Sequence, residues 1–515
     1  MAFTPSRRSL LQGVGVAASV LLVARGAGAT SSSRTGGIDL PRRAEASWLR
    51  RENELPGDGS WLHGIAESAG HLEGYASGTS VNLGDSISIF VSTNSPTLRA
   101  KVFRMGYYQG LGARLIETRE GIKGSDHPIP SPDQFGTVEC RWPSTFTLQT
   151  DRRYQPGQYL VRLEHVNNEY RFVPFVVRDD ASHATYVYLS AVTTWQAYNA
   201  WGGYSLYGKT NPTVTTTLSN AARAVRVSFN RPYDREFANG AADFIGNEFP
   251  FLFFAERLGL DMTYWTDIDL HENGARLTRH RALLSLGHDE YYSPAMRHAV
   301  TRAVNHGTNV AFLGANFCYR KIRFAPSLNG ANRLMINYRS TTDPIMKINP
   351  ALATVNWSQY PSDAPESAFS GSIYGGVDGT GSLRVVDASS WLWRGTDLVE
   401  GAALPNALGG EFNHFNPSGP SPPNVQLFGH SYVGSGLSDV TYVAQPGRGG
   451  VFTSGTGQWI YRMSDSPRLG GHWIPDALAN VTTPLQIATQ NLLALFAMGP
   501  AGTVMASVAN TNRFY

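Results

Sequence analysis

The sequence predicts a protein of mixed α and β structure, in which an antiparallel β-sandwich of immunoglobulin type precedes a doubly wound α/β sheet. Two patterns support this prediction. Between about residues 72 and 178, apolar and polar side chains alternate with period two, as in strands that bury one face. After residue 182, nearly continuous apolar runs alternate with helical segments, which is typical of a parallel sheet covered on both faces.

Four segments of the predicted sandwich have the alternation expected of strands. Turn residues separate them at short intervals, and they span residues 86–92, 99–104, 158–163 and 171–177. Ahead of them, the pattern of residues 42–53 predicts a short amphipathic helix. We therefore assign residues 71–180 to the sandwich and residues 30–70 to a linker or N-terminal arm.

The predicted α/β domain spans residues 181–500, and residues 501–515 form a C-terminal tail. Its strands are expected at 184–190, 262–265, 282–286 and 309–313, and its helices at 249–258 and 294–306. Residues 350–450 are rich in Gly and Pro, which predicts short strands that elaborate the sheet. A late strand at 451–453 and a closing helix at 482–498 complete the domain.

The first 29 residues have the features of a cleaved twin-arginine (Tat) export signal. Arg7 and Arg8 precede an apolar run at 14–24, and small residues at 27–29 suit a signal peptidase. The run is shorter than the roughly 20 residues that a membrane-spanning helix needs. The alternative is a retained membrane anchor. We expect export through Tat to the periplasm, the cell envelope or the medium, with no transmembrane segment after the signal is removed.

Composition narrows the classes of function. The formal charge is +3, and loss of the signal would bring it near zero, so nothing indicates nucleic acid as a partner. The 515 residues contain two cysteines, Cys140 and Cys318, which excludes a four-cysteine zinc site and a disulfide scaffold. The sequence leaves open whether the protein forms a homo-oligomer.

Ligands of open parallel sheets bind beyond the carboxyl ends of the strands, so we searched these ends for polar residues. The strand at 282–286 is followed by His288, Asp289 and Glu290, then by Tyr291 and Tyr292. Asp289 or Ser293 could cap the next helix, but capping does not require the other residues. The strand at 309–313 leads to Asn316 at the position of a nucleophile elbow. We therefore place the candidate catalytic residues His288, Glu290 and Asn316 at these two ends.

Two other segments contain candidate binding residues. An aromatic and amide-rich segment after the first α/β strand predicts the wall of a substrate pocket, with Arg231 nearby; its residues are Trp195, Tyr198, Asn199 and Trp201. The alternative is an aromatic loop that only packs under the sandwich. Further on, Glu411 stands in an apolar, glycine-rich setting, where a carboxylate needs a cation or hydrogen-bond donors. Arg231 or a metal ion could be its partner.

Taken in order, these motifs resemble the large (beta) subunit of N,N-dimethylformamidase and its relatives. The resemblance covers about residues 70–500. It rests on Thr194-Trp195-Gln196-Ala197-Tyr198-Asn199, on Gly287-His288-Asp289-Glu290-Tyr291-Tyr292-Ser293, on Gly314-Ala315-Asn316-Phe317-Cys318-Tyr319, and on shorter matches at 73–77, 79–81, 104–108, 112–115, 201–203, 231–233, 333–338, 343–344 and 449–459.

The resemblance implies that the α/β domain is glutamine-amidotransferase-like, with a flavodoxin-like doubly wound sheet and no cysteine nucleophile. It also implies one mononuclear iron (Fe3+) held by two tyrosines and a glutamate, hard oxygen donors that suit a ferric ion. Tyr291 and Glu411 match two of these ligands. Relatives carry the second tyrosine before a proline, where this chain has Phe249, so Tyr198 or Tyr292 would have to replace it.

The sequence supports three hypotheses. The first is an exported amidohydrolase that hydrolyses the C–N bond of a small or medium amide with help from a metal. The second is a non-catalytic exported protein that binds a carbohydrate or peptide through its aromatic loops. The third is a glycosidase that uses Asp289, Glu290 and Glu411.

Overall fold

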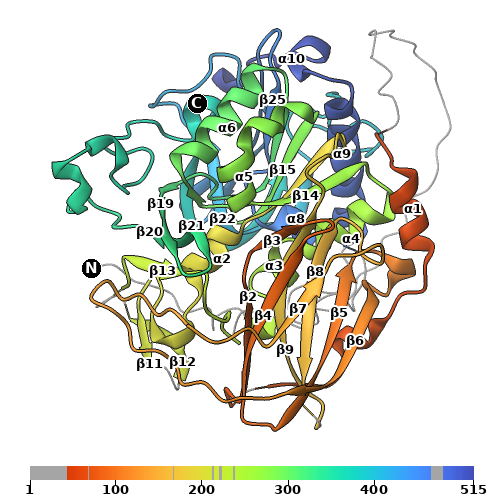
Figure 1. Cartoon of the computed structure of the whole chain (residues 1–515). Coiled ribbons are helices and arrows are strands. Elements are labelled where there is room, and N and C mark those ends of the chain that lie inside the picture. The colour runs from red at the N-terminus through yellow and green to blue at the C-terminus, as the bar shows by residue number, and fades with distance from the viewer. Residues whose placement is uncertain are drawn as a thin grey trace, which may run out of the picture. The chain divides into compact units, whose positions relative to one another are not determined.

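The structure is a computed structural model of the whole chain (Figure 1), and it describes residues 43–67, 69–165, 167–211, 214–219, 223–235, 238–464 and 479–515. Residues 40–515 form one compact unit. The predicted export signal at 1–29 lies outside the described residues. Among the described residues, we find no helix with the length and apolar character to cross a bilayer.

Two sheets form the N-terminal part of the molecule. The larger contains β1 (Ile65–Ala66), β9 (Glu169–Arg178), β8 (Gly157–Glu164), β5 (Thr97–Met105) and β6 (Ala113–Lys123), with β3 (Ser80–Asn82) also paired to β9. The smaller contains β2 (Leu72–Ala76), β4 (Ser86–Thr93) and β7 (Phe146–Gln149). Apolar side chains of both sheets, such as Ile89 and Val161, share one buried cluster. The two sheets therefore pack face to face.

The four strands predicted in this part correspond to β4, β5, β8 and β9. The purely antiparallel pairing that we predicted is wrong in one respect, because β1 and β3 both run parallel to β9. Two short segments extend the sheet beside the long strand β9, and with two and three residues they are too short for an alternating pattern to identify them as strands.

The second part is built on a seven-stranded sheet. Its order is β14 (Met262–Thr266), β10 (Tyr186–Ser190), β15 (Ala282–Gly287), β17 (Asn309–Gly314), β25 (Gly450–Thr453), β24 (Gly436–Ala444) and β23 (Gln426–Val433). The first five strands are parallel, and the last two join antiparallel. Helices cover both faces: Leu284 packs with residues of α4 (Phe249–Arg257) and α9 (Ala479–Ala497), and Leu283 packs with residues of α5 (Asp267–Asn273) and α6 (Pro294–Asn305).

Shorter elements surround this sheet. The helices are α1 (Ser47–Glu54), α2 (Val192–Tyr198), α3 (Phe244–Asn247), α7 (Ser367–Ser370), α8 (Gln458–Tyr461) and α10 (Ala501–Val504). The strand pairs are β11 (Lys209–Asn211) with β12 (Val214–Ser219), β16 (Tyr291–Tyr292) with β18 (Arg320–Lys321), and β21 (Ser372–Arg384) with β22 (Ala403–Phe415). A three-stranded sheet contains β13 (Arg226–Ser228), β20 (Gly330–Ile336) and β19 (Arg323–Ser327).

Two expectations about the second part need correction. The segment after β10 is not an open loop, because Val192–Tyr198 form helix α2, whose buried side chains continue the core. The strands between 350 and 450 are not short: β21 and β22 each have 13 residues. Register shifts at three places interrupt their pairing, so the glycines lie within a bent hairpin and do not end the strands.

A buried ion pair joins the two parts. Arg104 on β5 and Glu256 on α4 are both fully buried, and the guanidinium donates to the carboxylate at 2.9 and 2.8 Å. Tyr108 and Tyr264 add hydrogen bonds to the same two groups.

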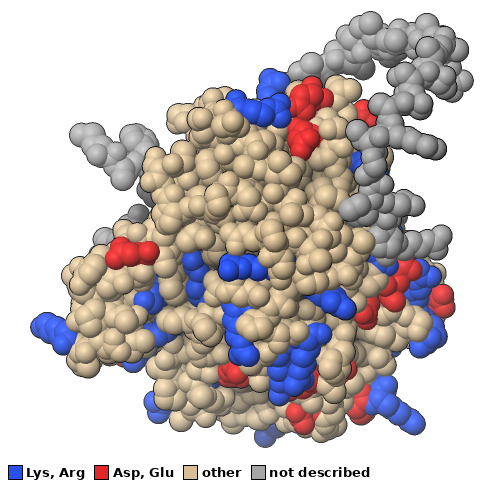
Figure 2. All heavy atoms as spheres, turned by 90° about the horizontal axis from the view of Figure 1, so that it is seen from above, with Lys and Arg blue, Asp and Glu red and all other residues tan. Residues whose placement is uncertain are grey.

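Most of the surface seen in Figure 2 is uncharged, and basic and acidic side chains are interspersed on it.

Candidate functional site

The candidate site lies at the carboxyl ends of β15 and β17, where ligands of parallel sheets bind. Each strand ends in a glycine, and the two glycines are partners in the sheet register. A Cβ on Gly314 would lie 1.6 Å from the carbonyl oxygen of Gly287, so Gly314 must lack a side chain for the strands to approach this closely. A Cβ on Gly287 would instead lie 2.4 Å from the carbonyl oxygen of Asn247. The chain then turns outward and presents His288 and Asn316 side by side.

Asn316 holds the turn after β17 in a conformation that few residues adopt. Its φ of 54° is in the left-handed region, which Asn tolerates better than most residues. Its backbone N–H donates to Asn413 Oδ1 at 2.6 Å, and its side-chain Nδ2 donates to Glu411 Oε1 at 3.2 Å. The elbow position predicted from sequence therefore links β17 to the strand β22 that provides Glu411.

His288 lies between two carboxylates. Its Nε2 is 3.3 Å from Glu290 Oε2, 3.0 Å from Glu411 Oε2 and 3.1 Å from Asn316 Nδ2. Burial lowers the pKa of His288, but the negative charges of Glu411 and Glu290 raise it, and Glu411 has the larger effect. Together the two carboxylates hold this pKa well above its usual value. The imidazole is therefore positively charged at neutral pH. Glu411 is the more accessible acid, with 21% of its side chain exposed against 2% for Glu290.

Glu290 is the carboxylate of the site whose position and charge are held by its neighbours. Its Oε2 accepts hydrogen bonds from the Tyr198 and Tyr207 hydroxyls at 3.0 and 2.7 Å, and its Oε1 accepts one from Arg320 Nε at 3.1 Å. Burial raises the pKa of Glu290, but the bond from His288 and the charge of Arg320 outweigh burial and lower this pKa to about 2. Glu290 is therefore ionised at every physiological pH and orients the groups around it.

Three phenols form a layer beside Glu290. The rings of Tyr198 and Tyr207 stack with centroids 4.0 Å apart, and the Tyr291 hydroxyl donates to the Tyr207 hydroxyl at 2.9 Å. Arg339 Nη2 donates to the Tyr291 oxygen at 2.6 Å, and the Arg339 guanidinium lies 4.0 Å above the Tyr207 ring. Burial and the charge of Glu290 raise the pKa of Tyr291 to about 12, so its hydroxyl keeps its proton at neutral pH.

The sequence interpretation missed three members of this cluster: Tyr207, Arg320 and Arg339. Tyr207 ends the aromatic segment that the binding-protein hypothesis used to hold a carbohydrate or peptide, but we did not choose it as a residue of this site. Arg320 comes two residues after Cys318 and forms the short parallel pair β16–β18, which no local pattern indicates. Arg339 lies outside any element, with a left-handed φ of 56°, and only the fold brings it to Tyr291. No local sequence signal identifies Arg320 or Arg339 as members of the cluster.

The other acidic group and the thiol that follow these strands, Asp289 and Cys318, make their hydrogen bonds away from His288. Asp289 is buried below the site and accepts hydrogen bonds from Ser285 and Tyr292 at 2.6 and 2.7 Å. Ser293, not Asp289, caps α6, since its hydroxyl accepts from the backbone of Met296. Cys318 faces Arg297 at 3.1 Å, and burial raises the pKa of its thiol to about 12. A glycosidase role for Asp289 would need this buried carboxylate to reach solvent.

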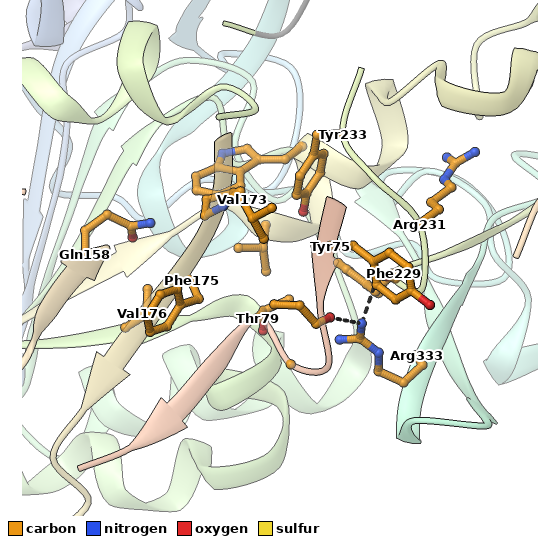
Figure 3. Close-up of a pocket in the computed structure, with 15 residues that line it drawn as sticks. Tyr75, Thr79, Gln158, Val173, Phe175, Val176, Phe229, Arg231, Tyr233 and Arg333 are labelled. Carbon is orange, nitrogen blue, oxygen red and sulfur yellow. Dashed lines mark hydrogen bonds between the residues drawn. The ribbon is translucent and has the colours of Figure 1, made fainter. Parts of the chain in front are cut away.

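Four predicted binding residues have hydrogen bonds or packing contacts away from His288. Arg231 donates to the carbonyl oxygens of Trp201, Tyr204 and Asn199, and Asn199 donates to Pro232. Trp195 and Arg231 line a cavity of about 20 Å³, enough for one water-sized molecule, near the sandwich strand β9 (Figure 3). Trp201 packs on Trp142, with ring centroids 6.0 Å apart. A substrate-binding role for these four residues stays a prediction.

The three residues expected to hold iron do not present their oxygens to one point. The Tyr198 hydroxyl bonds to Glu290, the Tyr291 hydroxyl bonds to Tyr207 and Arg339, and Glu411 bonds to His288 and Asn316. Within the described ranges, no group of three or more His, Cys, Asp or Glu side chains is arranged to hold a metal ion. As arranged, this donor set does not fit a mononuclear ferric ion, because Arg339 already donates a hydrogen bond to the hydroxyl oxygen of Tyr291.

Phe249 and Tyr292, the other alternative for the second tyrosine ligand, lie apart from this set. Phe249, which replaces the tyrosine of the resemblance, is buried in the core, with its ring 5.4 Å from that of Trp61. Tyr292 belongs to a different buried cluster from Tyr291 and bonds to Asp289. Neither side chain takes part in the hydrogen bonds around Glu290.

The fold and the site define a class of protein: a mixed α/β protein in which a histidine beyond the end of a parallel strand meets two carboxylates beside three phenols. The family model described as "N,N-dimethylformamidase beta subunit-like, C-terminal" matches residues 99–471. The chain belongs to this family, as the resemblance predicted.

Other comparisons are less informative. No curated protein matches the chain significantly. A solved structure, the cycloisomaltooligosaccharide glucanotransferase of Paenibacillus sp. complexed with cycloisomaltoheptaose, shares 9% identity over 73% of this chain and 68% of its own, with a TM-score of 0.17. A similarity this low carries no argument about fold or function.

Proposed function

We propose that this protein hydrolyses the C–N bond of an amide at His288 and Glu411. Family membership supports a hydrolase role of the dimethylformamidase type. The proposal includes the layout that the resemblance implies, an immunoglobulin-like sandwich followed by a glutamine-amidotransferase-like α/β domain. The single observation that carries the proposal is the position of His288 beyond the end of a parallel strand. Its Nε2 lies within 3.3 Å of the carboxylates of Glu290 and Glu411.

The two acids have different parts in this proposal. Glu411 is partly exposed, and its bonds to His288 and Asn316 fix its orientation, so it is the general base for water. Glu290 stays ionised and keeps His288 protonated, so His288 is the general acid for the leaving amine. The side-chain amide of Asn316 lies beside both groups and can donate to the developing oxyanion.

The reaction follows from these assignments. The oxygen of water attacks the carbonyl carbon, and Glu411 takes one proton from that water. The C–N bond breaks as the nitrogen takes the Nε2 proton of His288, which leaves a carboxylic acid and an amine. The acid then returns a proton to His288, and the amine takes the proton from Glu411. The products are a carboxylate and an ammonium ion, and both residues are restored.

The metal-assisted form of this reaction remains part of the proposal as an expectation from the resemblance. A ferric ion would polarise the amide carbonyl and acidify a bound water. It would require Tyr198, Tyr291 and Glu411 to give up their present hydrogen bonds. Elemental analysis of the natively exported protein tests it, and about one iron per chain would support it.

Amine release from a panel of amides tests the proposed hydrolysis. The panel contains N,N-dialkylformamides, N-alkylacetamides and N-acyl amino acids. We expect turnover of at least one class, and we expect Glu411→Gln and His288→Gln each to reduce kcat by about 100-fold or more. His298→Gln, on the exposed face of α6, is the matched control and should retain full activity. If no panel member is hydrolysed while one binds, the non-catalytic ligand-binding hypothesis replaces this proposal.

We also propose that the protein works outside the cytoplasm after export through the Tat pathway. The paired arginines and the small residues at 27–29 support this proposal. N-terminal sequencing of the protein recovered outside the cytoplasm should begin at Thr30. Replacement of Arg7 and Arg8 by Lys should retain the protein inside the cell, and unchanged export would contradict the proposal.

A further inference from the structure

We propose that the substrate carries an anionic group, a carboxylate, which binds at Arg339 and Arg223 beside the phenol layer. The inference rests on the proposed function, because it places the scissile amide at His288 and extends the substrate toward the two arginines. It deepens that function by naming the class of substrate, which is an amide bearing a carboxylate.

The contacts of Arg339 leave it available to a ligand. Its Nη2 donates to the Tyr291 hydroxyl and its Nε donates to Asn337 Oδ1 at 3.2 Å. Its Nη1 makes no hydrogen bond within the part of the chain that the structure describes. The side chain of Arg339 is partly exposed, and its guanidinium lies 4.0 Å above the Tyr207 ring, a contact that helps to fix its position. A pre-oriented guanidinium that keeps Nη1 without a hydrogen bond can donate to a carboxylate.

Arg223 adds a second cation on the same side. Its guanidinium donates to the carbonyl oxygens of Asn337 and Tyr338, the two residues before Arg339. Burial, and then the nearby charge of Arg339, lower the pKa of Arg223 to about 10. It stays protonated at neutral pH, so two like charges are held near each other at a cost that a bound anion would relieve.

The charges of the site do not balance without such an anion. Arg320 is paired with Glu290, and His288 is paired with Glu411 and Glu290. Among the described residues, Arg339 and Arg223 form no ion pair with a carboxylate. Removing a charge from water is costly unless an opposite charge compensates it, so these two partly buried cations would gain from an anion that a ligand provides.

The geometry also gives the order of groups along the substrate. A chain of contacts runs from Arg339 through the hydroxyls of Tyr291 and Tyr207 to Glu290, which contacts His288. The anionic end of the substrate therefore lies at Arg339, and the amide lies at His288. The stacked rings of Tyr198 and Tyr207 separate the two ends and offer an apolar surface to the atoms between them.

One pair of fluorinated probes tests this inference independently of turnover. N-(4-fluorobenzoyl)glycine carries a carboxylate, and its methylamide is the neutral match. Binding of each is followed by 19F NMR, and hydrolysis would appear separately as a 4-fluorobenzoate signal. We expect the anion to bind at least tenfold more tightly than the methylamide, and we expect high salt to weaken that preference.

Arginine variants test the place of binding. Arg339→Gln should abolish the tenfold preference, Arg223→Gln should reduce it, and Arg339→Lys should retain part of it because the charge remains. Arg448→Gln, on the exposed surface, is the matched control and should bind like the wild type. Circular dichroism checks that each variant folds, and Arg223→Gln gives an independent reading if Arg339→Gln does not.

The outcomes distinguish the two proposals. Equal affinity for both probes, no binding of the anion, or a preference that survives both glutamine variants overturns the inference. Tight, arginine-dependent binding without hydrolysis of any amide overturns the proposed function and leaves the anion site standing. Hydrolysis of neutral amides without any preference for the anion overturns the inference and leaves the proposed function standing.

Discussion

His288 and Glu411 come from distant parts of the sequence, and the fold brings His288 Nε2 to 3.0 Å from Glu411 Oε2. The histidine follows a parallel strand of the main sheet, whereas the glutamate lies in the long hairpin β21–β22. Asn316 joins them through its own bond to Glu411. Three separate segments thus meet at one imidazole, and each can be tested alone.

The first prediction concerns coupling between His288 and Glu411. If they act as general acid and general base of one reaction, the double variant His288→Gln/Glu411→Gln should lose little more activity than either single variant. Comparison of kcat for the three variants on one amide gives the coupling directly. Losses that multiply would mean that the two residues act independently.

The second prediction concerns pH and Glu290. The pKa of Glu290 is lowered to about 2 from an ordinary value of 4.5, so its contribution to stability is complete above about 4.5 and is lost as pH falls toward 2. The free energy of unfolding from urea titrations should therefore fall more steeply with acid in the wild type than in Glu290→Gln. Glu54→Gln, at an exposed position, is the control. Identical slopes in wild type and Glu290→Gln would contradict the assigned ion pairs.

The third prediction concerns His288 at high pH. Its pKa is raised, so the stability it contributes is complete below its ordinary value of about 6.5 and is lost only as pH rises through the higher folded value. Activity that needs the imidazolium should persist through neutral pH and fall in the alkaline range. The pH profile of kcat/KM measures this, and a fall centred near 6.5 would show that the carboxylates do not hold the proton.

Strands with strong periodicity could be predicted from the sequence, and those without it could not. The apolar runs of β10, β15 and β17 were identified within about two residues, because strands buried on both faces contain few polar side chains. The segments β1 and β3 were not, since only pairing with β9 makes them strands. Helix α2 was interpreted as a loop, and its valine, threonine and aromatic residues have lower helix propensity than most of the residues found in helices.

The residues of the candidate site also divide into those that a sequence pattern identifies and those that it does not. His288, Glu290 and Asn316 could be chosen because they follow predicted strands, and the rule for parallel sheets brings strand ends together. The pairing of Glu411 with His288 could not, because Glu411 lies in a hairpin whose path no local pattern indicates. Arg339 was missed for the same reason. Residues held by tertiary contacts between loops have no sequence signature of their own.

The fourth prediction concerns the ion pair between the two parts of the molecule. Glu256→Gln would leave the fully buried Arg104 without its carboxylate, which should cost about 3–5 kcal/mol in the free energy of unfolding. Urea denaturation of wild type and variant measures the loss, with Glu54→Gln as the exposed control. A loss below about 1 kcal/mol would mean that other hydrogen bonds of Arg104 hold the interface.

The last prediction concerns the close approach of β15 and β17. Gly314→Ala would place a methyl group 1.6 Å from the carbonyl oxygen of Gly287, and backbone atoms cannot yield as a flexible side chain can. The strands would have to separate where His288 and Asn316 leave the sheet, so we expect a loss of about 3 kcal/mol in stability together with reduced kcat. Gly246→Ala is the matched control: its new Cβ meets no atom within 4 Å, and α3 gains a better helix former. If Gly314→Ala behaved like Gly246→Ala, the register that positions His288 beside Asn316 would be wrong.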